Sequence, residues 1–256
     1  MLKSEKIRQL LEAKDTACLV ILDQFGVKYV DQDVFQFFSK CPTTDIMFFV
    51  SSSFVKRFAH DSSFNTRLPI QPNEIKETGI KHIHRKLCEC YKSIVPPDTK
   101  YYLSHFSILK ESNIYGVIFG SPSLLGLEKF LKVAWKMDPE TGESNYDIDD
   151  DPIRKIRGQR FFLEEMSTYK KLDAFEEEVK NLLVSNSVDN LSLYQFCLEH
   201  GFLPRHVVDL LGKWQDDNIL NVHNPKTGAI PKKGSYYIGW DYFKKNEQKL
   251  LFRIKE

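Results

Sequence analysis

Two short, uninterrupted apolar runs constrain the fold of this chain more than any other feature. They occupy residues 17–22 (ACLVIL) and 46–50 (IMFFV), and a segment of helical length, residues 31–39, separates them. Apolar runs without polar alternation are typical of strands buried on both faces of a parallel sheet. The pattern therefore predicts a right-handed βαβ unit, in which Asp31 or its neighbour caps the helix.

The chain that follows extends this unit into an α/β domain. Two β-rich runs joined by a short polar link predict an antiparallel hairpin, and proline pairs and apolar periodicity delimit the helices. The predicted elements are a helix over residues 80–94, strands over 101–109 and 114–119, and a helix over 124–137. The first domain is accordingly assigned to residues 1–137.

The composition changes abruptly at Asp138. Seven carboxylates and no basic residue occur in residues 138–151, and basic residues follow at once, so residues 138–172 are assigned to a charged linker. Residues 173–256 read as three helices followed by a two-stranded hairpin, the order of a winged-helix domain. The predicted helices cover 175–184, 192–200 and 204–217, and the candidate strands cover 219–223 and 235–240.

Composition excludes several classes of protein. Thirty-six basic and 35 acidic residues give a net charge of +1, so any attraction to nucleic acid or to a membrane must come from local patches. No apolar run approaches the ~20 residues of a membrane-spanning helix, and the start lacks the apolar stretch of a secretory signal. Five scattered cysteines predict reduced thiols and a cytoplasmic protein.

The first strand ends in the sequence L-D-Q-F-G at residues 22–26. Ligands of open α/β sheets bind outside the carboxyl ends of the strands, where a carboxylate and an aromatic ring can orient a planar substrate. We therefore take Asp23 and Phe25 as candidate catalytic residues; the candidate substrate-binding residues are Gln24, Gly26, Ser51 and Ser52. The alternative is a plain turn in which Asp23 caps local amides and the serines are ordinary strand-exit residues.

Metal-ligand spacings give no site. His82 and His84, like Cys88 and Cys90, fall two residues apart on one predicted helix and therefore point to different sides. Residues 147–151 are rich in aspartate but lack the glycine and distal glutamate of a calcium loop. The sequence thus predicts no metal-binding residues.

Nucleic-acid contacts are expected in the winged-helix region. The third predicted helix carries Arg205 and Lys213 among aspartates, and the wing carries Lys226, Lys232 and Lys233. Phosphate contacts require basic side chains, so these five residues are the candidate DNA contacts. A winged helix that docks onto a protein remains an equal alternative.

Two segments resemble the three-Cys-motif partner (TcmP) family of methyltransferase-like proteins. The first is L-D-Q-F-G at residues 22–26, which is similar to the family's D-P-[FY]-G element, with Gln24 in place of proline. The second joins G-L-E-K-F at residues 126–130 to A-W-K-M-D-P-E-T-G at residues 134–142. The predicted hairpin lies between the two segments, in the order that the family shows.

The resemblance implies the later half of a methyltransferase-type Rossmann sheet. The family's glycine-rich S-adenosylmethionine segment has no counterpart before Asp23, and neither G-x-G-x-x-G nor G-x-x-x-x-G-K-[ST] occurs in the chain. We expect a second protein subunit to complete the sheet and to bring most of the adenosylmethionine site. The chain is then a subunit of a split methyltransferase-like assembly that acts on nucleic acid, and it is an enzyme only within that complex.

Two other functions fit the same sequence. One is a non-catalytic scaffold, or a DNA-binding winged-helix component, of a defence or phage-related complex. The other is a transcriptional regulator that binds DNA through its winged helix.

Overall fold

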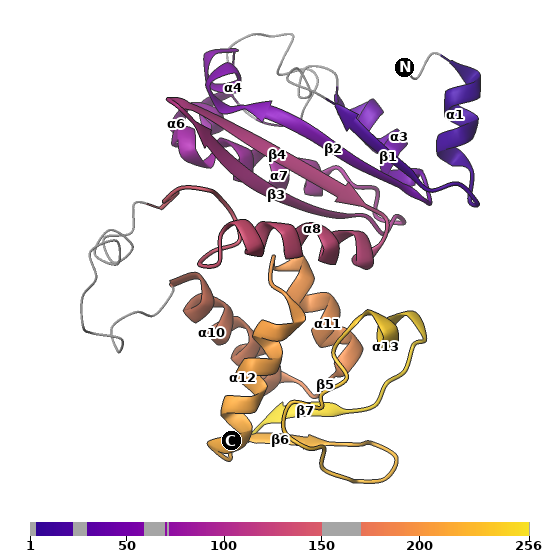
Figure 1. Ribbon diagram of the computed structural model, residues 1–256, viewed down its shortest axis with the longest axis vertical. Helices are drawn as coiled ribbons and strands as arrows, with labels where there is room; N and C mark the ends of the chain where they lie inside the picture. Colours follow the sequence, from indigo (N-terminus) through magenta and orange to yellow (C-terminus); the bar gives the residue numbers. More distant parts are fainter. Residues whose placement is uncertain (1–3, 23–29, 59–69, 71, 150–169, 256) are drawn as a thin grey trace. The chain divides into compact units, whose positions relative to one another are not determined.

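The computed structural model describes residues 4–22, 30–58, 70, 72–149 and 170–255. The chain folds into two compact units, residues 1–160 and 161–256, which are described separately (Figure 1). In the part of the chain so described, no helix is both long and apolar enough to cross a membrane.

The first unit is built on a mixed four-stranded sheet with the strand order β1-β2-β4-β3. The strands are β1 (Cys18–Leu22), β2 (Thr44–Ser51), β3 (Tyr102–Lys110) and β4 (Asn113–Ser121). β1 and β2 are parallel, with Leu22 opposite Phe48, whereas β4 is antiparallel to both β2 and β3. The predicted βαβ unit and hairpin are thus confirmed.

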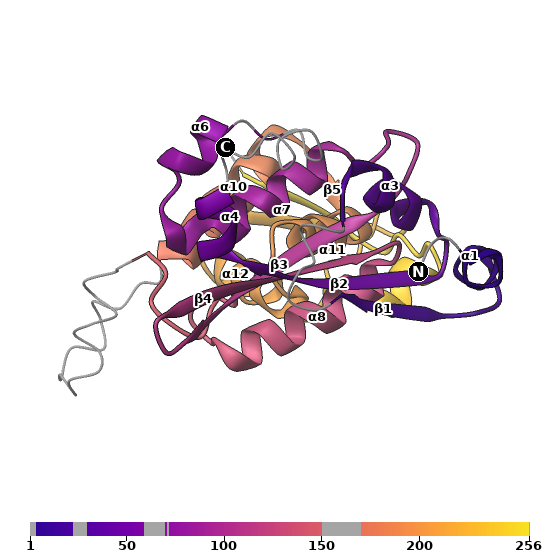
Figure 2. The same cartoon turned by 90° about the horizontal axis from the view of Figure 1, so that it is seen from above.

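Helices cover both faces of this sheet (Figure 1). They are α1 (Glu5–Glu12), α3 (Gln32–Lys40), α4 (Ser52–Phe58), α6 (Pro72–Glu77), the 3₁₀ turn η1 (Ile80–His82), α7 (Ile83–Ser93) and α8 (Leu124–Met137). Among the described helices of this unit, α8 covers one face, and α3 and α7 lie on the other (Figure 1). α1 lies beside the β1 end of the sheet in both views (Figure 2), where Thr44 Oγ1 donates a hydrogen bond of 3.0 Å to the carbonyl of Leu11.

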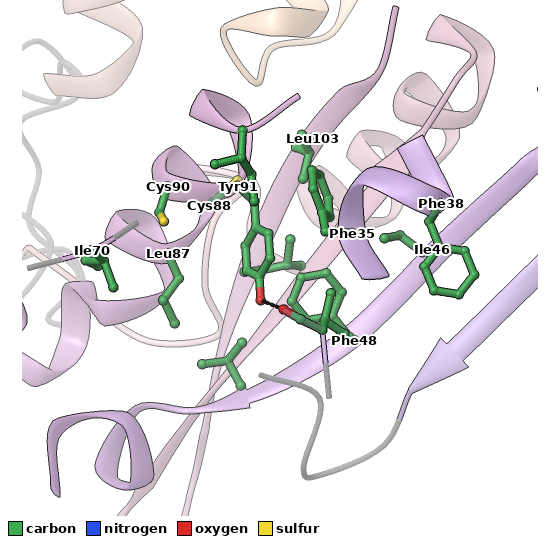
Figure 3. Packing of buried hydrophobic residues seen from close by; sticks show 14 of the residues in the cluster. Phe35, Phe38, Ile46, Phe48, Ile70, Leu87, Cys88, Cys90, Tyr91 and Leu103 are labelled. Carbon is green, nitrogen blue, oxygen red and sulfur yellow. Dashed lines mark hydrogen bonds between the residues drawn. The ribbon is translucent and has the colours of Figure 1, made fainter. Parts of the chain in front are cut away.

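The core between α3, α7 and β2 is aromatic (Figure 3). The Tyr91 ring lies 4.9 Å from Phe35 and 5.0 Å from Phe48, measured between centroids. Its hydroxyl donates a hydrogen bond of 2.7 Å to the carbonyl of Val30, so the buried polar atom is satisfied. As predicted, Asp31 caps α3 by accepting from the amide of Val34 at 2.9 Å.

The prediction that β1 is buried on both faces is wrong. Its side chains alternate: Val20 packs against the core, but Leu19 and Ile21 are 57% and 59% exposed. The reason is position, because β1 is an edge strand and α8 packs across β3 and β4. One apolar row of β1 therefore stays uncovered by the described residues.

Residues 138–149, assigned to the linker by composition, pack on the α/β unit. Asp138 is only 2% exposed and Ser144 is fully buried. The acidic composition of this segment reflects buried hydrogen-bonding roles, described below, in addition to solvation.

The second unit contains the three helices predicted for a winged helix, a further short helix and a small sheet. Its elements are α10 (Lys170–Ser185), β5 (Val188–Asp189), α11 (Asn190–Glu199), α12 (Pro204–Asp216), β6 (Leu220–His223), α13 (Trp240–Lys244) and β7 (Leu251–Ile254). The strand order is β5-β7-β6, with both pairs antiparallel. We call residues 224–250, which connect β6 to β7, the wing.

The predicted second strand over residues 235–240 is not formed. Tyr237 has a φ of 56°, in the left-handed region that interrupts an extended strand. The partner of β6 is instead β7, which places Val222 opposite Phe252. The wing is consequently much longer than the sequence predicts.

Candidate functional site

The parallel strands β1 and β2 have their carboxyl ends at the same end of the sheet. Asp23, Gln24, Phe25 and Gly26 follow β1 but lie outside the described residues, so their catalytic and substrate-binding roles stay predictions.

Of the two candidate serines, Ser51 ends β2 and is half-buried, and Ser52 begins α4. Ser51 Oγ accepts from the amide of Phe54 at 3.3 Å, which makes it a local cap for α4. Ser52 is fully buried, and its hydroxyl has no hydrogen-bond partner among the described residues. The substrate-binding roles of Ser51 and Ser52 therefore stay predictions.

A pair of histidines lies where α7 packs on β3. His84 of α7 packs against His105 of β3 with 5.0 Å between the ring centroids and 69° between the ring planes. The helix reaches the sheet here because β4 has Gly116 at the contact, where a Cβ atom would collide with the Cβ of His84. Because Gly116 has no side chain, α7 can pack close enough to β4 to bury His84.

Glu143 reaches these histidines from a segment that pairs with the outer edge of β3. The amide of Ser107 donates to the carbonyl of Glu143 at 2.7 Å, and the amide of Asn145 donates to the carbonyl of Ser107 at 3.2 Å. This parallel bridge places Glu143 Oε1 3.7 Å from Nε2 of His105.

The turn that carries Glu143 is organised around the buried carboxylate of Asp138. It accepts from the amides of Glu140, Thr141, Glu143 and Ser144 at 3.2–3.4 Å, and from the hydroxyl of Thr141. Gly142 closes the turn with a φ of 62°, and a Cβ there would lie 2.5 Å from the buried ring of Trp135. The D-P-E-T-G sequence is therefore a structural turn that positions Glu143.

Arg85 forms ion pairs with the carboxylates beside the two histidines. Its guanidinium binds both oxygens of Glu143, with Nη2 at 2.9 Å from Oε2, and Nη1 lies 2.7 Å from Oδ1 of Asp149. The hydrogen bond from Arg85 lowers the pKa of Asp149. Burial, reinforced by the neighbouring His105, lowers the pKa of His84 to about 3, so this imidazole is neutral at pH 7.

His84, His105 and Glu143 together form a candidate ligand set, whose donor atoms all lie within 4.8 Å of one another. Spacing along the chain does not reveal it, because the three residues come from α7, β3 and the turn after α8. His82, the near neighbour considered from sequence, has Nδ1 2.9 Å from Nη1 of Arg85 instead.

The cysteines near this helix are free thiols in the core, as the sequence predicts. Burial raises the pKa of Cys88 to about 12 and that of Cys90 to about 11. Figure 3 shows both among aliphatic and aromatic side chains. They therefore stay protonated, which makes them poor nucleophiles and poor metal ligands.

Of the predicted DNA contacts, three are paired or shielded locally. Lys213 binds Glu176 at 3.0 Å, Lys233 binds Asp216, and Nε of Arg205 lies 3.2 Å from the ring of His206. α12 also exposes Asp209, Asp216 and Asp217. The exposed side of this helix is consequently mixed in charge.

The wing and the two strands that flank it, β6 and β7, differ in net charge from the rest of the second unit. Residues 220–255 contain eight basic and two acidic residues, a net charge of +6, whereas residues 170–219 contain five basic and nine acidic ones. Four lysines of the wing are exposed and form no ion pair with a described residue: Lys226, Lys232, Lys244 and Lys245. Sequence reasoning missed the last two, although the K-K dipeptide marks them.

Asn190, the first residue of α11, holds the wing in place. It is fully buried and uses both ends of its amide. Nδ2 donates to the carbonyls of Tyr237 and Glu247 at 3.0 and 3.1 Å, and Oδ1 accepts from the amides of Lys249 and Leu250 at 2.8 and 3.3 Å. One side chain therefore ties two separate parts of the wing to the helices.

Comparison with known proteins agrees with this architecture. Residues 145–227 match the model of the family described as the GMT-like wHTH domain. Neither the curated proteins nor the solved structures contain a match. The C-terminal unit is therefore a winged-helix domain, similar to the GMT-like wHTH domain in the region that the match covers.

Proposed function

We propose that this chain is the DNA-binding subunit of a methyltransferase-like assembly that acts on nucleic acid. The observation that carries the proposal is the concentration of exposed, unpaired lysines in the wing of a winged-helix domain. Such domains are commonly DNA-binding modules, and lysine contacts with phosphates supply most of their non-specific affinity.

The charge distribution favours contact through the wing over contact through α12. Three exposed aspartates on α12 would repel phosphates, and Lys213 is already neutralised by Glu176. The wing offers Lys226, Lys232, Lys244 and Lys245 with two acidic residues in the whole segment that contains them. Backbone contact by the wing is the arrangement that these charges support.

Replacing the four wing lysines by glutamine is expected to weaken binding to mixed-sequence double-stranded DNA. Each lost phosphate contact removes about 0.9 from the slope of log K against log salt concentration, so the slope should fall by about three to four. Fluorescence anisotropy over a series of salt concentrations measures the affinity and the slope together.

A matched variant controls for net charge. Lys40, Lys92, Lys100 and Lys136 are exposed lysines of the first unit, and their replacement by glutamine should leave the slope nearly unchanged. Equal losses in the two quadruple variants, or no DNA binding by the unmodified chain at low salt, would contradict the role of the wing.

The methyltransferase-like part of the proposal is supported by the topology of the sheet. β4 runs antiparallel between β2 and β3, and many doubly wound folds carry an antiparallel strand toward one edge of an otherwise parallel sheet. β1 forms the opposite edge of the sheet, and Leu19 and Ile21 are exposed on one of its faces. Proteins normally cover an open strand edge and an apolar surface of this kind. We infer that an adenosylmethionine-binding half on a partner subunit joins the sheet at β1.

The purified chain alone is therefore expected not to bind S-adenosylmethionine at micromolar concentrations, as measured by calorimetry. The amides of β1 should also exchange hydrogen faster than those of β2 and β4, because no described strand pairs with the outer side of β1. Micromolar binding by the chain alone would refute the split site and leave the DNA-binding role of the wing intact.

A second candidate is a non-catalytic scaffold, favoured by the mixed charges along α12. Asp209, Lys213, Asp216 and Lys233 line one groove beside this helix, a surface better suited to a protein than to DNA. Changing Asp23 to alanine separates the two functions, because a scaffold would retain the full activity of the assembly and a catalytic subunit would not.

A further inference from the structure

His84 is a fully buried polar side chain that the fold leaves unsatisfied. Its residue exposure is 0%, and neither Nδ1 nor Nε2 has a hydrogen-bond partner among the described residues. Buried polar groups are nearly always paired, so an unpaired imidazole in the interior indicates a missing partner. That partner must bind a ring nitrogen of His84.

The groups nearest to His84 define the chemistry of this partner. His105 supplies a second imidazole and Glu143 supplies a carboxylate, and one donor atom from each of the three residues lies within 4.8 Å of the other two. Two imidazoles and one carboxylate form a ligand set for zinc and related divalent ions, and three protein ligands leave one coordination position open. We propose that His84, His105 and Glu143 bind one divalent transition-metal ion, for which zinc is the probe.

The surroundings are arranged as they are in metal sites. Arg85 and the Asp138 turn fix the carboxylate of Glu143, and hydrogen-bonded carboxylates are the usual support around metal ligands. Zinc–nitrogen bonds of about 2.0 Å require the donors to close by roughly 1 Å, a side-chain movement.

The donor set also selects among ions. Calcium and magnesium prefer sites made entirely of oxygen ligands, which one carboxylate does not provide. Cys88 and Cys90, on the same helix, are not part of this group of donor atoms.

The test uses the full chain, freed of metal by a chelator and then titrated with Zn²⁺ by calorimetry. One ion per chain is expected, with no binding of Mg²⁺ or Ca²⁺ under the same conditions. Co²⁺ should give a visible absorption of low-symmetry coordination without the near-ultraviolet band of a cobalt–thiolate bond. A thiolate band, or the absence of Zn²⁺ binding by the folded chain, would overturn the proposal.

Variants assign the site to its residues. His105→Gln should weaken Zn²⁺ binding by at least about a hundredfold, and Arg85→Lys, which disturbs the support of Glu143 and leaves the three ligands in place, by about ten- to a hundredfold. His223→Gln is the matched control, because His223 is also a partly buried strand histidine but lies in the second unit. Circular dichroism verifies that each variant is folded. Equal losses in His105→Gln and His223→Gln would refute the site.

Discussion

Changing Asp138 to alanine is expected to destabilise the first unit by about 3 kcal/mol or more. The carboxylate is buried and satisfies four backbone amides and one hydroxyl, and each buried donor left without a partner costs about 1–3 kcal/mol. Urea denaturation measures the loss. The fluorescence of Trp135, whose ring packs against Gly142, reports on the turn itself.

An exposed aspartate of the same unit provides the control. Asp98→Ala removes a carboxylate that lies at the surface, and its effect should stay within about 0.5 kcal/mol. If the two variants unfolded at the same urea concentration, Asp138 would not organise the turn. Because the turn carries Glu143, Asp138→Ala should also weaken Zn²⁺ binding in proportion to the disorder that it causes.

Replacing Asn190 by alanine is expected to release the wing from the winged-helix unit. The amide makes four hydrogen bonds to the backbone at residues 237, 247, 249 and 250, so its removal leaves buried donors and acceptors unpaired at a cost of about 3 kcal/mol. Hydrogen exchange should show loss of protection at Lys249 and Leu250 while α10 and α12 stay protected. DNA affinity should fall with it, because the lysines are no longer held together.

Asn221→Ala tests whether this effect belongs to the buried amide. Asn221 is an exposed residue of β6, and its replacement should leave both exchange and DNA affinity close to those of the unmodified chain. Full protection of the wing in Asn190→Ala would show that other contacts suffice to hold it.

Local patterns predicted the elements of the fold well, because each pattern is set by a single segment. The apolar run of β1, the proline pair after α7 and the apolar face of α8 each specify one element without reference to the rest. The burial of β1 was misjudged because it depends on the place of the strand in the sheet. Residues 17–22 contain no information about which helix covers β3 and β4.

The candidate sites depended on contacts between distant segments, and the sequence gives no local sign of them. His84 and His105 meet through the register of β3 and the space left by Gly116. Glu143 joins them only because residues 143–145 pair with Ser107. The wing was predicted too short for the same reason, since Asn190 is about sixty residues from the amides that it binds.

The bridge between Ser107 and Ser144 has a consequence for assembly. With the hydrogen bonds between the Asn145 side chain and the backbone of Leu109, it covers part of the outer side of β3, whereas no described strand covers β1 at the other edge of this sheet. A sheet with one protected edge and one open edge can be extended in one direction only. A partner subunit that joined the sheet at β1 would occupy this open edge, which prevents copies of the chain from pairing there and growing into a fibre.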